Sequence, residues 1–261
     1  MKDWTCMWMK KIMKKLKKLL SSRRLWMISL LVILGILYYM NKHVVITSYE
    51  IPYDEDLTIV HLSDIHHMKI NDSIVKKIQS KTPDIIVITG DFIDRRFYDL
   101  ESSLEWIDRL DYPIYYVTGN HEAWSGHADE VTSQLISRGV HVLRNDYESI
   151  GNFRIIGYDD PAFNSFEPLD IDGYKIVLYH RPESFDQFEA DLILSGHAHG
   201  GQIRLFGKGL FSPGQGFMPE YTSGCHDLED KKLIISRGLG NSLFPFRIFN
   251  QPEIVVIHIG K

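Results

Sequence analysis

The stretch Leu192–Gly201 reads Leu-Ile-Leu-Ser-Gly-His-Ala-His-Gly-Gly. Its apolar start predicts a short buried strand, and its glycines predict a tight backbone turn where that strand ends. His197 and His199 therefore lie on a strand-end loop, the usual position of ligand-binding groups in an α/β fold. Each imidazole needs a partner for its ring nitrogens, so two of them one residue apart are unusual in a core. The pattern indicates metal binding, and the alternative is two surface histidines in a polar turn.

The composition is that of a globular protein with one large domain and an appendage. The chain has 261 residues, of which 44% are hydrophobic and 24% are charged. Its two cysteines, Cys6 and Cys225, lie far apart in the sequence. Such a pair makes neither a disulfide framework nor a thiolate zinc site, so a metal would be held by histidine, aspartate and asparagine.

Charge is unevenly distributed along the chain. Residues 1–24 carry nine lysine and arginine residues and one aspartate, which gives +8, and residues 25–40 carry no charge. Because the whole chain has a net charge of −5, the remainder carries −13. An acidic main domain argues against nucleic acid as a partner.

The first 40 residues predict a membrane anchor. Lysines alternate with apolar residues in Lys10–Leu20, so residues 1–24 are predicted to form a basic amphipathic cytoplasmic segment that suits an anionic membrane surface. A solvated tail is the alternative. Residues 25–40 are uncharged and carry aromatic residues at both ends, as a transmembrane helix does. As a helix this segment would span about 24 Å, which is short for a hydrocarbon core of about 30 Å.

The position of the lysines predicts the topology. They precede the span, which places the N-terminus in the cytoplasm and the main domain, residues 41–261, outside it. No small-residue cleavage signal follows the span, which favours an uncleaved signal anchor over a cleaved signal peptide. We therefore expect a single-pass protein of the cell membrane with an extracytoplasmic main domain.

Apolar strands and amphipathic helices alternate through the main domain. Strands are predicted at Leu57–Ser63, Asp84–Thr89, Ile114–Thr118, Val140–Leu143, Phe153–Gly157, Tyr174–Tyr179 and Leu192–Ser195, and near Tyr221–Gly224, Leu233–Ser236 and Glu253–Ile259. Helices are predicted at Asn71–Lys81, Leu100–Leu110 and Asp129–Arg138. This alternation predicts an α/β sheet with helices on its faces, and the late run of strands suggests a second sheet packed against the first.

Residues that suit metal binding follow five of the predicted strands. They are Asp64 and His66; Asp91 and Asp94; Asn120 and His121; His180; and His197 and His199. Such groups converge at the carboxyl edge of a sheet, where α/β folds bind their ligands. One Gly-Asp pair can be only a turn, but turn chemistry does not explain five such blocks in order.

This order of motifs resembles the calcineurin-like metallophosphoesterase superfamily. The family pattern is Asp-x-His, Gly-Asp-x-x-Asp, Gly-Asn-His-Asp/Glu, a lone His and Gly-His-x-His, and all of it is present between about Ile46 and Lys261. The tract Gly196–Arg204, with Ser236–Gly240 and Pro252-Glu253, resembles a branch of membrane-associated or exported bacterial phosphoesterases similar to UDP-2,3-diacylglucosamine hydrolases. The resemblance implies a four-layer αββα sandwich and a site for two divalent metal ions.

The resemblance also implies a role for each site residue. One metal would be held by Asp64, His66, Asp91 and His199, and the second by Asp91, Asn120, His180 and His197, with Asp91 as the bridge. His121 would face the leaving oxygen and protonate it or donate a hydrogen bond to it, and Asp94 would fix the His121 tautomer. Mn²⁺ is the first expectation, and Fe, Zn²⁺ or Ni²⁺ are alternatives, because these ligands accept all of them.

These expectations define a predicted reaction. A water that bridges two such cations becomes hydroxide near neutral pH and attacks phosphorus in line. The predicted function is therefore a metal-dependent phosphoesterase that cleaves a phosphomonoester, phosphodiester or pyrophosphate bond. The anchor and the glycine-rich, aromatic loop Phe206–Pro219 favour a membrane-proximal substrate, either lipid-linked or nucleotide-linked. The alternatives are a non-catalytic metal-binding module and a protein phosphatase, in which Arg95 would contact the phosphate.

Three further histidines are placed less clearly by the sequence. His61 lies inside a predicted strand, which favours a core residue. His226 could reach the site from a later loop, and His67 is predicted to point away from the site although it follows His66.

Overall fold

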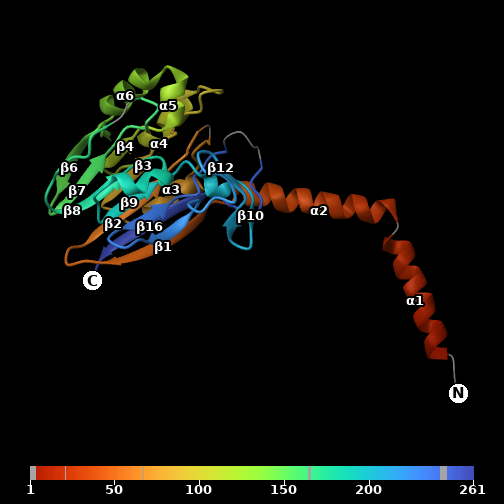
Figure 1. The fold of residues 1–261 in the computed structure, drawn as a ribbon. Helices are drawn as coiled ribbons and strands as arrows, with labels where there is room; N and C mark the ends of the chain where they lie inside the picture. Colours follow the sequence, from red (N-terminus) through yellow and green to blue (C-terminus); the bar gives the residue numbers. More distant parts are fainter. Residues whose placement is uncertain (1–3, 21, 67, 164–165, 242–245) are drawn as a thin grey trace.

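The computed structural model describes residues 4–20, 22–66, 68–163, 166–241 and 246–261. Its main body consists of two facing sheets with helices on an outer side, and two N-terminal helices extend away from this body (Figure 1). The C-terminus lies in the body, at the end remote from these helices (Figure 1).

The first sheet has six strands, most of them parallel. In spatial order they are β1 (Val45–Pro52), β16 (Glu253–Gly260), β2 (Leu57–Leu62), β3 (Ile85–Thr89), β4 (Ile114–Val117) and β5 (His141–Val142). The strands from β2 to β5 run parallel, whereas β16 is antiparallel to β2 and parallel to β1. β2 and β3 are almost continuous apolar runs because both faces of this sheet are covered.

Helices cover the outer face of the first sheet. They are α3 (Asp72–Gln79), α4 (Leu100–Asp108) and α6 (Ala128–Ser137), and the six-residue helix α5 (Asn120–Ser125) precedes α6. Polar caps fix where the first two begin: Asn71 Oδ1 accepts the Ile74 N–H at 3.1 Å, and Asp99 Oδ1 accepts the Ser102 N–H at 3.1 Å. The buried indole of Trp106 fills the layer between α4 and the sheet.

The second sheet faces the first and closes the core. In spatial order its strands are β14 (Gly224–Asp227), β15 (Lys232–Ile235), β9 (Leu192–Ser195), β8 (Tyr174–Leu178), β7 (Phe153–Gly157) and β6 (Asp146–Ile150). Apolar side chains from both inner faces form one buried cluster, which confirms the α/β sandwich. The fourth layer is thin: the 3₁₀ helix η1 (Pro182–Gln187) and stacked aromatic residues cover the outer face of this sheet.

The prediction from the sequence misplaced one strand and missed several other elements. The strand expected near Tyr221–Gly224 lies further along the chain, as β14 (Gly224–Asp227). Its position is set by antiparallel pairing with β15, in which Asp227 lies opposite Lys232 beside the connecting turn. β1 was not predicted, because it pairs with β16 about 200 residues later in the chain. β6 was also missed, since most of its residues are exposed at a sheet edge, and α5 is too short to show a helical period.

The N-terminal helices are α1 (Trp4–Leu20) and α2 (Arg23–Lys42). α2 has 20 residues and is therefore about 30 Å long, which is longer than the predicted span of residues 25–40. By length and composition, Arg24–Lys42 could cross a membrane, and none of it is buried in the protein. Where α2 ends, Asn41 exchanges two hydrogen bonds with the backbone of Arg247, at 3.0 and 2.7 Å.

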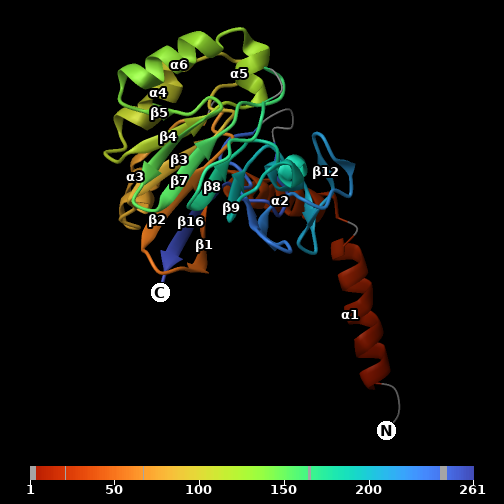
Figure 2. The ribbon, with the colours of Figure 1, turned by 60° about the vertical axis from the view of Figure 1, so that its left-hand side comes forward.

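The segment expected to be a long loop, Phe206–Pro219, is folded into two small hairpins. β10 (Arg204–Leu205) pairs with β11 (Lys208–Gly209), and β12 (Phe211–Ser212) pairs with β13 (Gly216–Phe217). Both hairpins lie at the end of the body where α2 joins it, as the two views agree (Figures 1 and 2).

Candidate metal centre

The structure brings the seven predicted metal ligands together in one buried site. Each lies at or just beyond the carboxyl end of a strand: two after β2, one after β3, one after β4, one after β8 and two after β9. In this chain order they are Asp64, His66, Asp91, Asn120, His180, His197 and His199, and all are buried. The sandwich thus positions the ligands where its strands converge, as expected for an α/β fold.

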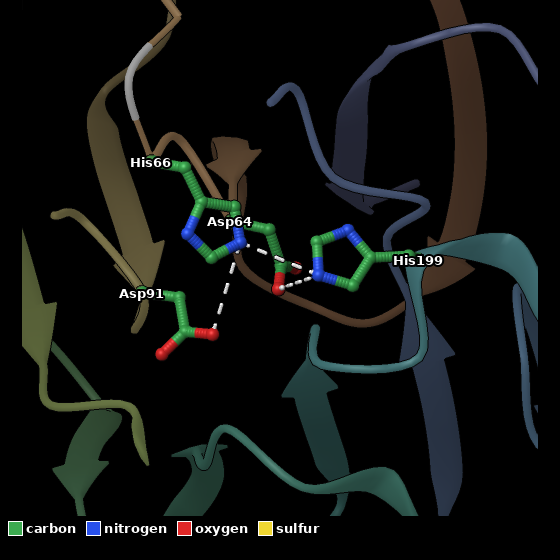
Figure 3. A group of neighbouring side chains, drawn as sticks. All are labelled: Asp64, His66, Asp91 and His199. Atoms are coloured by element: carbon green, nitrogen blue, oxygen red, sulfur yellow. Dashed lines mark hydrogen bonds and ion pairs between the residues drawn. The ribbon is translucent and has the colours of Figure 1, made fainter. Parts of the chain in front are cut away.

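Four of these residues form the first group of potential ligands (Figure 3). His66 Nε2 lies 3.3 Å from His199 Nε2, and His199 Nε2 lies 3.4 Å from Asp64 Oδ1. Asp91 Oδ2 completes the group at 3.9 Å from His66 Nε2. The spacing and the chemistry of these nitrogen and oxygen atoms suit one divalent cation.

A second group surrounds His180. Its Nε2 lies 3.3 Å from Asp91 Oδ2, 3.2 Å from Asn120 Oδ1 and 3.2 Å from His197 Nδ1. Asp91 Oδ2 therefore belongs to both groups. The other oxygen, Asp91 Oδ1, accepts the backbone N–H of His121 at 2.8 Å, which fixes the orientation of the carboxylate.

Backbone carbonyls select the tautomer of two ligand histidines. His180 Nδ1 lies 2.7 Å from Thr89 O, and His66 Nδ1 lies 3.3 Å from Ile93 O. Because a carbonyl can only accept, each Nδ1 carries the proton, and each Nε2 is left with a lone pair when the ring is neutral. This arrangement is the one that ligand histidines use around metals, so the residues fit two metal ions.

Burial and neighbouring charges set the protonation of the site. Burial lowers the pKa of His66 to about 4 and those of His197 and His199 well below the usual value, which keeps these ligands neutral. Burial opposes ionisation of Asp91, but His180 and other nearby histidines hold its pKa well below the usual value. These three imidazoles are therefore neutral and the Asp91 carboxylate is negative. Burial opposes protonation of His180, but Asp91 and Asp64 raise its pKa to about 10, so His180 would release a proton on binding a cation.

The backbone at the site is strained. Five of the seven ligands have a positive φ, which is uncommon for residues other than glycine. They are Asp64 (49°), His66 (49°), Asp91 (50°), His197 (64°) and His199 (47°). Such strain costs on the order of 1–3 kcal/mol per residue and concentrates at functional sites, so it supports the assignment independently of the side chains.

His121 and Asp94 lie beside the first group, with one difference from the expected contact. His121 Nδ1 accepts the backbone N–H of Arg95 at 3.2 Å, whereas Asp94 Oδ1 is 3.9 Å away, too far for a hydrogen bond. Asp94 instead accepts the backbone N–H of Arg96 at 2.7 Å. The expectation that Asp94 fixes the His121 tautomer is therefore corrected: the backbone N–H of Arg95 supplies that contact, because the Asp94 carboxylate is held by Arg96 instead.

Two supporting residues were not assigned a role from the sequence. Glu122 is buried and accepts the backbone N–H groups of Asp91 at 3.0 Å, Gly119 at 2.7 Å and Ile93 at 3.1 Å. It thereby joins two ligand loops, and its place in the Gly-Asn-His-Glu motif was the available signal. Asn250 donates to His199 O at 2.7 Å, and no local pattern marks this residue.

His61 and His226 are not members of either group. His61 is buried, and its Nε2 lies 2.8 Å from Thr89 Oγ1, which confirms a core position. His226 contacts Ser223 O and the ring of Tyr221 instead of reaching the site. His67 lies outside the described residues.

Sequence comparison assigns this fold and site to a family. The chain belongs to the family described as Calcineurin-like phosphoesterase, whose profile matches residues 57–201. The resemblance seen in the motifs is thus confirmed, and the chain is a metallophosphoesterase, a hydrolase of phosphoester bonds.

Three relatives show how far the similarity extends. A metallophosphoesterase of Campylobacter jejuni is 34% identical over 231 residues, which cover 79% of this chain and 60% of that protein. Metallophosphoesterase YkoQ of Bacillus subtilis is 32% identical over 227 residues, which cover 78% of this chain and 84% of that protein. Phosphodiesterase YaeI of Escherichia coli is 26% identical, with 77% and 81% covered. The UDP-2,3-diacylglucosamine hydrolase-like branch is not distinguished by these names and stays a prediction.

Proposed function

We propose that this chain is a dinuclear metallophosphoesterase that cleaves a phosphomonoester, phosphodiester or pyrophosphate bond of a membrane-proximal substrate. The observation that carries the proposal is the position of Asp91 Oδ2, which lies 3.3 Å from His180 Nε2 in one group and 3.9 Å from His66 Nε2 in the other. When bound, two divalent cations supply Lewis-acid polarisation of the phosphoryl group and activation of water. Mn²⁺ is proposed first, with Fe, Zn²⁺ and Ni²⁺ as alternatives.

His121 is proposed to contact the reacting phosphoryl group through Nε2. Its Nδ1 accepts the Arg95 N–H, so in the neutral ring the proton resides on Nε2, which lies 4.0 Å from Asp91 Oδ2. This N–H can donate to a phosphoryl or leaving-group oxygen and stabilise the charge that develops there. In a doubly protonated His121 ring, the proton on Nδ1 would face the Arg95 N–H, which is also a donor. His121 is therefore proposed to donate a hydrogen bond to the substrate oxygen and not to transfer its proton fully.

A phosphodiester is the preferred bond within this proposal, with support from one relative. YaeI is named a phosphodiesterase, and the chain covers 81% of its length. The protein-phosphatase alternative has less support, because the Arg95 guanidinium lies over the exposed ring of Trp124, 4.7 Å from its centroid. In that position the cation is engaged by an aromatic face.

The membrane location is proposed from the N-terminal helices. α2 has the length and composition of a span, and the lysine-rich α1 precedes it. The positive-inside rule then places α1 in the cytoplasm and the catalytic body outside, with residues 25–40 as an uncleaved anchor. A lipid-linked or nucleotide-linked substrate at the outer surface would follow from this arrangement.

The test is hydrolysis of bis-p-nitrophenyl phosphate by the full-length protein in detergent. The protein would be stripped of metal and reloaded with Mn²⁺, Fe²⁺, Zn²⁺ or Ni²⁺, alongside Asp91→Ala, His121→Gln and the control His127→Gln. We expect metal-dependent turnover that is lost in Asp91→Ala, reduced in His121→Gln and unchanged in the control, because His127 is an exposed partner of Glu130. Two bound metals without turnover on any phosphoester would favour the non-catalytic module, and no bound metal would overturn the site.

A further inference from the structure

We propose that an apolar collar beside the end of α2 inserts into the same lipid bilayer that α2 crosses. The collar consists of six exposed side chains: Phe206, Phe211, Phe217, Met218, Phe246 and Phe249. The inference rests on the proposed membrane span and goes beyond it, since it concerns a second, independent membrane contact made by the catalytic body.

The exposure of these apolar side chains indicates an interaction surface. Phe206 is fully exposed, Phe217 is 78% exposed and Phe249 is 64% exposed. Single exposed apolar residues are normal on a protein surface, but several large ones on adjoining segments mark an interaction site. Phe206, in the turn of the first hairpin, and Met218, directly after β13, have positive φ values of 52° and 54°, which carry a conformational cost.

Hydrogen bonds join the collar to the end of α2. Asn41, in the last turn of α2, donates to Arg247 O at 3.0 Å and accepts the Arg247 N–H at 2.7 Å. The segment that carries Phe246 and Phe249 is thereby fixed to the helix. That segment also accepts from the first hairpin, since the Arg204 N–H donates to Ile248 O at 3.0 Å.

The two hairpins are joined to each other in the same way. The Met218 N–H donates to Leu210 O at 2.9 Å, so the second hairpin follows the first without an intervening gap. Both hairpins lie next to the base of α2 in the two views (Figures 1 and 2). The collar is therefore continuous with the apolar surface of the span.

Charged residues next to the collar match a membrane interface. Lys42 ends α2, and Lys208 lies two residues after Phe206; both are exposed. Aromatic side chains with flanking lysines are typical of the headgroup region, where lysine can contact anionic lipid. A second copy of the chain is the competing occupant, but it would have to approach the body at the point where the span leaves it.

The collar also bears on the substrate. Asn250 donates to His199 O at 2.7 Å and to Gln202 O at 3.2 Å, so one side chain ties a metal ligand to the start of the first hairpin. Insertion of the collar would hold the metal centre at a fixed height above the bilayer, near the headgroups. The substrate class that fits this geometry is an amphiphile whose phosphoester lies in the headgroup region.

The experiment measures the depth of single spin labels in the full-length protein. Cys6→Ser and Cys225→Ser provide the background, and labels are attached at Phe206→Cys and Phe217→Cys in nanodiscs of phosphatidylcholine and phosphatidylglycerol that hold one chain each. Leu34→Cys in α2 is the membrane reference. Tyr147→Cys is the aqueous control, because Tyr147 is exposed on β6 at the far end of the body. Turnover of bis-p-nitrophenyl phosphate by each variant checks that the fold and site are intact.

The readout is relaxation enhancement by oxygen, which enters lipid, against a nickel chelate, which stays in water. We expect the labels at 206 and 217 to be at least fivefold less accessible to nickel than the label at 147, as the label at 34 is. If the labels at 206 and 217 are as accessible to nickel as the label at 147 while the label at 34 is protected, the proposed insertion of the collar is overturned and the proposed span stands. Nickel access at 34 as well would overturn both proposals. Protection at 206 and 217 that appears only with two chains per disc would assign the surface to a second copy.

Discussion

The Nε2 atoms of His66 and His199 lie 3.3 Å apart in the buried site, and Asp64 Oδ1 lies 3.4 Å from the second of them (Figure 3). Burial lowers the pKa of both rings, so neither is positively charged near neutral pH. Two neutral imidazoles and a carboxylate that meet in a low-dielectric interior leave lone pairs unsatisfied. A divalent cation between them satisfies these lone pairs, so the stability of the fold should depend on metal.

Metal removal should therefore lower the melting temperature. A ligand that binds only the folded state at about 100 times its Kd stabilises by about 2.7 kcal/mol. Removal of one such metal from a body of this size lowers Tm by on the order of 5–10 °C. Calorimetry of the full-length protein before and after chelation measures the shift, and His199→Ala should show a smaller one. Equal melting temperatures with and without chelator would contradict the metal centre.

His121→Gln should reduce turnover without removing metal. The Nε2–H of His121 is the donor next to the shared oxygen of Asp91, at 4.0 Å, and it is not required as a ligand. Loss of a transition-state hydrogen bond or of acid catalysis lowers kcat by about 10²–10³-fold. Metal content per chain, measured by mass spectrometry, should stay at the wild-type value. A variant that loses metal together with activity would reassign His121 as a ligand.

Asp94→Asn tests the corrected role of Asp94. Its carboxylate accepts from Arg96 and lies 3.9 Å from His121 Nδ1, so it influences His121 through charge and not through a hydrogen bond. We expect a loss of kcat of about tenfold or less, smaller than that of His121→Gln. Steady-state kinetics of the two variants side by side decide the order. A loss in Asp94→Asn as large as in His121→Gln would restore the direct contact predicted from the sequence.

Much of the site could be predicted because its ligands directly follow strands. Asp91, for example, comes after four apolar residues, a threonine and a glycine, so its position at the sheet edge follows from local pattern alone. Contacts that depend on distant segments could not be predicted. Glu122 accepts the Asp91 N–H across 31 residues, and Asn250 reaches His199 across 51. Such contacts depend on how the two sheets pack, for which local periodicity carries no signal.

The fold shows the same limit. The patterns of β2 and β3 predicted two strands of an α/β sheet, and the structure pairs them. β1 was not predicted, because its partner β16 is at the other end of the chain. Likewise, the Arg95–His121 hydrogen bond joins residues 26 positions apart, and no local pattern indicates such a contact.

Gly196→Ala should disrupt the first metal group. A Cβ at this position would lie 2.5 Å from Asp64 Oδ2 and nearer still to Ser63 Oγ, so the ligand carboxylate must shift. We expect loss of bound metal and a destabilisation of about 1–3 kcal/mol from overpacking. The control is Gly139→Ala, where φ is +79° but no described residue beyond its chain neighbours lies within 4 Å of the added Cβ, so only backbone strain of about 1 kcal/mol applies. Metal content equal in both variants would show that the close approach at Gly196 is not needed for the site.

His61 should make the stability of the metal-free protein depend on pH. Burial lowers the pKa of His61 to about 3 from 6.5 in the unfolded chain. Below pH 6.5 the unfolded chain binds a proton that the folded chain excludes, so stability falls as the pH drops from 6.5 towards 3. At pH 5 the difference is 1.5 pH units, or about 2 kcal/mol.

His61→Gln isolates this contribution, because the buried ligand histidines contribute equally in both proteins. Urea unfolding of metal-free wild type and variant at pH 7 and pH 5 gives the comparison. We expect the wild type to lose about 2 kcal/mol more than the variant between the two pH values. Equal losses would mean that His61 accepts a proton in the folded chain, through its Nδ1, which has no hydrogen-bond partner among the described residues. Its contact with Thr89 would then have to persist with a charged ring, which the buried strand position makes costly.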